Sequence, residues 1–87
     1  MNSPIKELRE NLKLKQVEMA REAGVSPAHI SEVEHCLVNI NGKLLKFLEE
    51  NHFDVEKIEE QQDACILEHE LLVKANLKSF LVPPNNE

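Results

Sequence analysis

Aromatic residues are scarce in this chain, and their scarcity excludes several kinds of protein. The 87 residues include three Phe, no Tyr and no Trp, and only two Gly. Because strands are enriched in aromatic and β-branched residues, this composition argues against a sheet-rich fold. It also argues against a platform for single-stranded nucleic acid, since such platforms stack bases on aromatic rings. The chain is therefore expected to be all-α.

Long apolar runs are missing as well. No stretch approaches the roughly 20 apolar residues that a membrane-spanning helix needs. The first ten residues, MNSPIKELRE, lack the apolar centre of a signal peptide. Two isolated cysteines are compatible with a reducing compartment. We therefore expect a cytoplasmic protein that makes no membrane contact, with one domain and a modest core.

Residues 16–35, QVEMAREAGVSPAHISEVEH, predict two short helices joined by a tight turn. Apolar residues recur at helical spacing on both sides of Gly24, which can end a helix because it enters the left-handed region without a Cβ penalty. Ser26 is a good N-cap, and Pro27 stands at the first helical position, where a missing N–H is harmless. Small Ala20 lets the two helices approach closely.

Caps and periodicity predict further helices on both sides of this pair. The first begins at the Ser3-Pro4 pair. Another follows the cap Asn41 and ends near Asn51-His52, because Asn tolerates a left-handed turn best among residues other than Gly. Asp54 caps the start of the last one.

This pattern resembles the lambda-repressor and Cro-like (Xre) family of helix-turn-helix DNA-binding proteins. The matching residues are Gln16, Ala20, the turn Gly24-Val25-Ser26, Ile30, Ser31, Val33 and Glu34. The resemblance extends to about Ile58. It implies a five-helix domain over residues 1–58 that binds double-stranded DNA, with Glu34 supporting the fold through hydrogen bonds.

The resemblance also implies which residues meet DNA. They are Lys15, Gln16, Ser26, Pro27, Ala28, His29, Ser31, Glu32, Asn39, Asn41 and Lys43. In this docking geometry the start of the second helix of the pair faces base edges in the major groove. Ala28 could touch a thymine methyl, His29 could donate to guanine or a phosphate, and Glu32 could accept from cytosine N4. Gln16 and Lys43 are expected at the phosphates.

Simpler interpretations of several of these residues stay open. Lys15 could be part of a solvated connector, because surface lysines are common. His29 could be an ordinary surface histidine. Asn41 is explained equally well by a capped turn, so Lys43 is the residue that discriminates between the two interpretations.

Residues 59–82 form an extension that is predicted to be helical, followed by a flexible tail over residues 83–87. No Pro or Gly interrupts the stretch up to Phe80, and apolar residues recur at heptad-like spacing. This gives more apolar surface than one small domain needs, which predicts a homodimer contact. The predicted contact residues are Cys65, Leu67, Leu71, Leu72, Ala75 and Phe80. The alternative is that this helix folds back on its own domain.

Charge is distributed unevenly, and this supports a second functional hypothesis. The chain up to Lys46 contains seven Lys and Arg and six acidic residues. The rest of the chain contains three Lys and ten acidic residues, and the net charge of the whole chain is −6. Phosphate neutralisation by basic residues supplies most non-specific DNA affinity. The leading hypothesis is a homodimeric repressor on a palindromic operator. The alternative is a helix-turn-helix module with weak or no DNA binding that docks a protein partner through its acidic half.

Other chemistry has little support. Cys65 and His69 are four residues apart, and His35 adjoins Cys36, but this is not a recognised zinc spacing. The chain has no phosphate-binding loop and no pair of catalytic carboxylates. We therefore predict no metal, no cofactor and no enzymatic activity.

Overall fold

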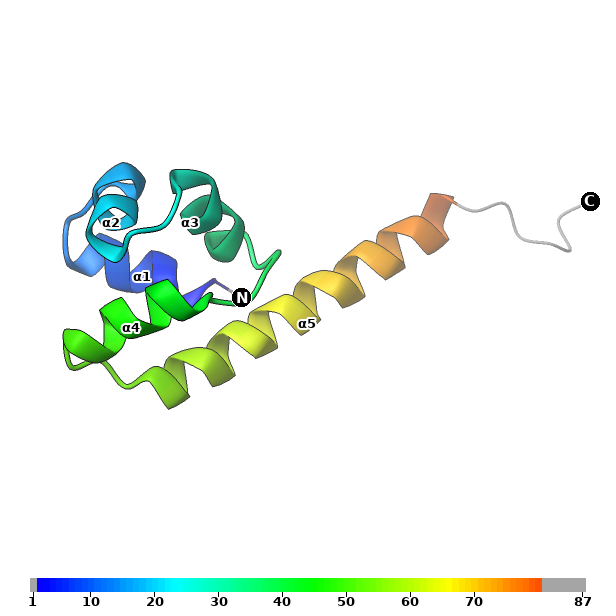
Figure 1. Cartoon of the computed structure of the whole chain (residues 1–87). Coiled ribbons are helices and arrows are strands. Elements are labelled where there is room, and N and C mark those ends of the chain that lie inside the picture. The colour runs from blue at the N-terminus through cyan, green and yellow to red at the C-terminus, as the bar shows by residue number, and fades with distance from the viewer. Residues whose placement is uncertain (1, 81–87) are drawn as a thin grey trace, which may run out of the picture.

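The computed structural model describes residues 2–80, with side chains up to residue 78, and this part of the chain folds into five α-helices without a strand. The helices are α1 (Pro4–Asn11), α2 (Gln16–Ala23), α3 (Pro27–Glu34), α4 (Gly42–Glu50) and α5 (Val55–Phe80). Helices α1 to α4 gather into one cluster, and α5 passes beneath it and then extends away as a single long helix (Figure 1). The all-α, five-helix expectation is confirmed.

Side-chain caps begin the helices where the sequence predicted them. At α3 the Ser26 hydroxyl accepts a hydrogen bond from the His29 backbone N–H at 3.1 Å. At α4 the Asn41 side-chain oxygen accepts from the Leu44 N–H at 2.9 Å. Ser3 caps α1 in the same way. Each cap satisfies an N–H group that has no partner inside the helix.

Helix α2 begins and ends differently from its neighbours. Its N-cap residue, Lys15, makes no side-chain cap, and the Glu18 carboxylate instead accepts from the Lys15 backbone N–H at 2.8 Å. Gly24 ends the helix with a φ of 73°, in the left-handed region. The predicted stop at Gly24 is confirmed.

The turn after α4 contradicts one detail of the sequence interpretation. His52, with a φ of 65°, takes the left-handed position that was assigned to Asn51. Asn51 has a φ of −96°, and its side-chain amide donates to the Phe47 carbonyl at 2.7 Å. The Asn51 side chain and its backbone N–H therefore both bond the Phe47 carbonyl at the helix end, and the left-handed turn falls one residue later. Cys36 takes a similar position after α3, with a φ of 60°.

The core joins all five helices. Its most completely buried apolar members are Ile5, Met19, Ala20, Ile30, Val33, Leu44 and Leu48. Ala20 is 1% exposed at the contact between α2 and α3. A larger side chain there would separate the two helices, as the sequence predicted.

Helix α5 has two parts with different surroundings. Ile58, Gln62 and Cys65 are buried, so the packing of α5 on the cluster continues beyond the predicted boundary at residue 58. Residues 70–78 are all exposed. The segment over residues 70–78 is therefore not buried against its own domain. No helix within residues 2–80 is long and apolar enough to cross a membrane.

The two cysteines are not isolated in space. Cys36, just after α3, and Cys65, in α5, form a disulfide with their Cα atoms 5.5 Å apart. Cys65 is 1% exposed, so it faces its own domain. Its assignment to a dimer contact was therefore wrong, because the apolar repeat in the sequence does not distinguish contact within a chain from contact between chains.

Candidate nucleic-acid interface

The start of α3 presents short, exposed side chains. Ser26, Pro27 and Ala28 are exposed at this helix start, and Glu32 is exposed one turn later. The N-terminus of the helix carries the positive end of the helix dipole. This end can approach a phosphate or a base edge without displacing a bulky side chain.

His29 connects the start of α3 to the loop before α4. The Asn41 backbone N–H donates to His29 Nε2 at 3.4 Å, and the His29 side chain is half-buried. A neutral imidazole that accepts at Nε2 carries its proton on Nδ1. His29 is therefore positioned by the protein, and its Nδ1–H is the group left to donate to a ligand.

A shallow open groove joins this helix start to the start of α4. It is lined by Gly24, Val25, Ser26, His29, Glu32, Asn41, Gly42 and Lys43. Two helix N-termini therefore open onto one groove, and the exposed Lys43 adds a cation. Such an arrangement favours an anion. Glu32 places a carboxylate in the same groove, which opposes a phosphate there.

The remaining predicted DNA contacts lie outside this groove. Lys15 and Asn39 are exposed elsewhere on the surface. The Ser31 hydroxyl lies 3.5 Å from Nδ1 of His35, whose ring nitrogen also lies 2.7 Å from the Ser31 carbonyl oxygen. Gln16 lines a second cleft, together with His35.

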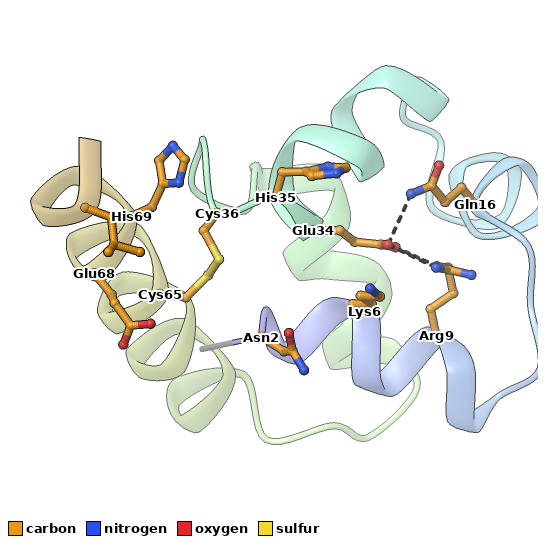
Figure 2. Close-up of a pocket in the computed structure, with 11 residues that line it drawn as sticks. Asn2, Lys6, Arg9, Gln16, Glu34, His35, Cys36, Cys65, Glu68 and His69 are labelled. Carbon is orange, nitrogen blue, oxygen red and sulfur yellow. Dashed lines mark hydrogen bonds and ion pairs between the residues drawn. A yellow bond between two sulfur atoms is a disulfide. The ribbon is translucent and has the colours of Figure 1, made fainter. Parts of the chain in front are cut away.

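In that second cleft, Glu34 connects α1, α2 and α3 (Figure 2). Arg9 donates from Nε and Nη2 to the two Glu34 oxygens at 2.5 and 3.0 Å, and Gln16 Nε2 donates to Oε1 at 3.1 Å. Arg9 also donates from Nη1 to the Leu14 carbonyl at 2.9 Å. The supporting role predicted for Glu34 is confirmed. Sequence reasoning missed Arg9, because nothing local pairs it with a residue 25 positions away.

The ionisation of Glu34 reflects these contacts. Burial raises its pKa, whereas the hydrogen bonds from Arg9 and Gln16 and the charges on Arg9 and Lys6 lower it. The lowering effects are together larger, and the pKa of Glu34 lies below its ordinary value. The hydrogen bond to Glu34 also raises the pKa of Arg9, although burial opposes this. The pair therefore stays ionised at neutral pH.

This arrangement leaves Gln16 in one defined orientation at the start of α2. Its Nε2 donates to Glu34, the last residue of α3. The amide group carries a second N–H and a carbonyl oxygen, so one Gln16 side chain has the capacity to bond Glu34 and an external acceptor together.

Most of the predicted dimer residues are exposed on α5. Leu67, Leu71 and Leu72 are each 57% exposed, and Leu77, which the sequence interpretation left out, is 58% exposed. Ala75 is exposed among them. The side chain of Phe80, also predicted here, lies outside the described residues. Leu77 was missed because it departs from the strict seven-residue spacing. We call Leu67, Leu71, Leu72, Ala75 and Leu77 the α5 apolar surface.

A cluster of metal ligands is absent from the part of the chain that the structure describes. No group of three or more His, Cys, Asp or Glu side chains converges there as metal ligands. His35, Cys36, Cys65 and His69 do line one cleft, but the two sulfur atoms are bonded to each other.

Comparison with known proteins agrees with this geometry. Residues 5–51 match the family model HTH_3, described as helix-turn-helix, and this match covers more than half of the chain. No curated protein and no solved structure matches the chain significantly. The matched segment contains α2, the turn at Gly24 and α3, together with the groove between α3 and α4. The chain belongs to the Xre, or lambda-repressor-like, helix-turn-helix family of DNA-binding regulators.

Proposed function

We propose that this DNA-binding regulator is a homodimeric repressor that occupies a short palindromic operator in the cytoplasm. The observation that carries the proposal is the groove in which the starts of α3 and α4 meet beside Lys43. One α3 helix offers few groups for base contacts. A symmetric dimer would double them and read two half-sites about one helical turn apart.

Within each half-site, α3 enters the major groove with its first turn. Ala28 and His29 face the bases, and Glu32 accepts from a cytosine amino group. Lys43 and the free N–H groups at the start of α4 bind a backbone phosphate. Lys15, Gln16 and Asn39 contact phosphates beside them. Ser26, Pro27 and Ser31 complete the surface of α3 against the duplex.

The α5 apolar surface supports the dimer. Its four leucines are each more than half exposed. The second part of α5, which carries them, extends beyond the cluster of α1 to α4 (Figure 1). Clustered exposed leucines on one helix favour burial against a second helix of the same kind. This dimer would place the acidic part of each chain away from DNA.

The test is titration of duplex DNA at several salt concentrations. Specific binding should weaken as salt rises, with a slope that reflects a few phosphate contacts. Lys43→Ala should weaken binding to all sequences alike and reduce this slope by about one. Lys46→Ala is the matched control, because Lys46 is exposed on the same helix but does not line the groove. Equal effects of the two variants on DNA binding would show that Lys43 makes no specific contact with DNA.

The alternative function is a protein-docking module with weak DNA binding. It is favoured by Glu32, whose carboxylate lies in the groove, and by the absence of Lys and Arg from α3. On this hypothesis the acidic second half binds a basic protein. Glu32→Gln discriminates the two hypotheses. It should strengthen non-specific DNA binding if the groove meets phosphates, and leave DNA binding unchanged if the groove does not contact DNA.

A further inference from the structure

The Cys36–Cys65 disulfide joins the recognition unit to the projecting helix. Cys36 lies two residues after the end of α3, and its backbone N–H bonds the Val33 carbonyl at 3.0 Å. Cys65 lies in α5, 29 residues later in the sequence. The bond therefore connects the end of the DNA-reading helix directly to the helix that carries the α5 apolar surface (Figure 2).

The disulfide lies at the point where α5 leaves the cluster of α1 to α4. Among the α5 side chains that the structure describes, up to residue 78, Cys65 is the last one that is buried, and Leu67 is already 57% exposed. The disulfide is thus a covalent attachment of α5 to the cluster at this point. Beyond it, the direction of the projecting segment depends on how firmly α5 is held at this point.

One turn earlier, a non-covalent attachment holds the same helix. The Gln62 side-chain amide donates to the Val33 carbonyl at 2.8 Å and to the Val38 carbonyl at 3.1 Å. Its Oε1 accepts from the Ser3 hydroxyl at 2.7 Å. These bonds keep the base of α5 folded when the disulfide is open, so opening it loosens α5 without detaching it.

We propose that Cys36 and Cys65 form a reversible redox site that sets how rigidly α5 is fixed to the recognition unit. In the disulfide state α5 has one direction, and in the dithiol state it pivots about the Gln62 attachment. The regulatory consequence rests on the proposed function. If α5 joins two chains, its direction sets the spacing of the two α3 helices and therefore the affinity for a two-part operator.

The cytoplasm, where we propose that the protein works, favours a reversible Cys36–Cys65 disulfide over a permanent one. DNA-binding regulators work where thiols are kept reduced, and disulfides found there are usually transient and redox-sensing. This cysteine pair therefore forms its bond when an oxidant is present. The burial of both residues in a precise position shows that the fold accommodates the bond.

The disulfide closes and opens by thiol–disulfide exchange with a small thiol reagent, which accepts or supplies the two electrons. For closure, a small disulfide accepts two electrons from Cys36 and Cys65, whose thiols lose two protons, and leaves as two thiols. For opening, the thiolate of a dithiol reductant attacks one protein sulfur to give a mixed disulfide. Its second thiol then displaces the protein sulfur, so the reductant leaves as a disulfide and both cysteines regain protons.

A cleft gives such a reagent a route to the bond. The cleft has a volume of about 430 Å³, and both cysteines line it together with Lys6, His35 and His69 (Figure 2). Cys36 is 7% exposed and Cys65 is 1% exposed, so attack is expected at Cys36. Lys6 adds a positive charge to the same cleft, which favours an anionic thiolate.

The first test needs no DNA. Amide hydrogen exchange is measured on the full chain after oxidation with glutathione disulfide and after reduction with dithiothreitol. Exchange in residues 62–70 should be about tenfold faster in the reduced form, because a local opening becomes easier. Exchange in α4 should be unchanged, since α4 carries neither cysteine. Identical exchange of α5 in both forms would overturn the proposal.

The second test measures DNA affinity in the same two states. The oxidised chain should bind its operator about fivefold or more tightly than the reduced chain, in the range of ordinary coupling between sites. The double variant Cys36→Ala and Cys65→Ala should bind DNA as the reduced chain does, and its affinity should change with neither glutathione disulfide nor dithiothreitol. Equal affinities in the two states would overturn the regulatory role.

The two tests also separate this proposal from the function on which it rests. If α5 exchange depends on the redox state but neither state binds DNA, the proposed repressor function fails and the redox site stands. If the chain binds DNA but α5 exchange is insensitive to reduction, the redox site fails and the proposed repressor function stands.

Discussion

At the scale of single residues, Glu34 has the largest influence on the architecture of the site. It receives three hydrogen bonds from Arg9 and Gln16, and through them α3 is held to α1 and α2. Its side chain is 3% exposed, and that of Arg9 is 15% exposed. The pair is thus largely shielded from water, and removing one partner leaves the other poorly solvated.

Glu34→Gln should lower the free energy of unfolding by about 1 to 3 kcal/mol, because the Arg9 charge loses its partner. Urea denaturation at neutral pH and fixed protein concentration measures the change. Glu22→Gln is the control, since Glu22 is exposed on α2 and should shift stability by less than about 0.5 kcal/mol. Equal losses in the two variants would contradict the role given to Glu34.

The lowered pKa of Glu34 predicts how this stability depends on pH. A carboxyl whose pKa is depressed by folding contributes stability above its unfolded pKa of about 4.3, and loses it as pH falls through the lower folded value. The difference in unfolding free energy between the native chain and Glu34→Gln should therefore shrink below about pH 4. A difference that stays constant from pH 7 to pH 3 would refute this.

At the scale of elements, the short helices depend on their ends. Each of α1 to α4 has eight or nine residues, which is too short for a stable isolated helix in water. Caps and burial of one face therefore decide where they begin. Helix α2 is the exception, because Lys15 provides no side-chain cap and the Glu18 carboxylate compensates only in part.

Lys15→Ser should raise the free energy of unfolding by about 0.5 to 1 kcal/mol, because a hydroxyl at the N-cap accepts from a free N–H of α2. Thermal unfolding followed by circular dichroism measures it. Lys13→Ser is the matched control, since it removes the same charge two residues earlier, in a left-handed turn with a φ of 59°. A similar gain in both variants would mean that charge removal, not capping, stabilises the chain.

At the scale of the whole molecule, α5 determines how two recognition units could be arranged. Its first part belongs to the packed cluster, and its second part exposes leucines to solvent. A long rigid helix transmits orientation over its full length. The proposed dimer, the placement of the acidic half and the redox site all depend on this one element.

Leu71→Lys should convert a homodimer into a monomer, because it places a charge at the centre of the α5 apolar surface. Sedimentation velocity measures the assembly state. Leu12→Lys is the control, since Leu12 is 43% exposed but lies at the end of α1, far along the chain from this surface. Dissociation by both variants, or by neither, would argue against a contact through α5.

The sequence by itself determined the helices, the turn and the family. Caps such as Ser26 and Asn41 and the stop at Gly24 act within one turn of the chain, so the amino-acid order is enough to locate them. The apolar spacing of α5 is equally local. Whether the apolar side chains of α5 are exposed to solvent, however, is not determined by their spacing in the sequence.

Only the tertiary structure decided which distant side chains meet. Gln62 bonds Ser3 across 59 positions, Arg9 pairs with Glu34, and Cys36 reaches Cys65. Each contact depends on the angle and register at which helices pack, and these are set by the shape of the whole core. A pattern within one helix holds no information about that angle, which is why the cysteine pair was not predicted.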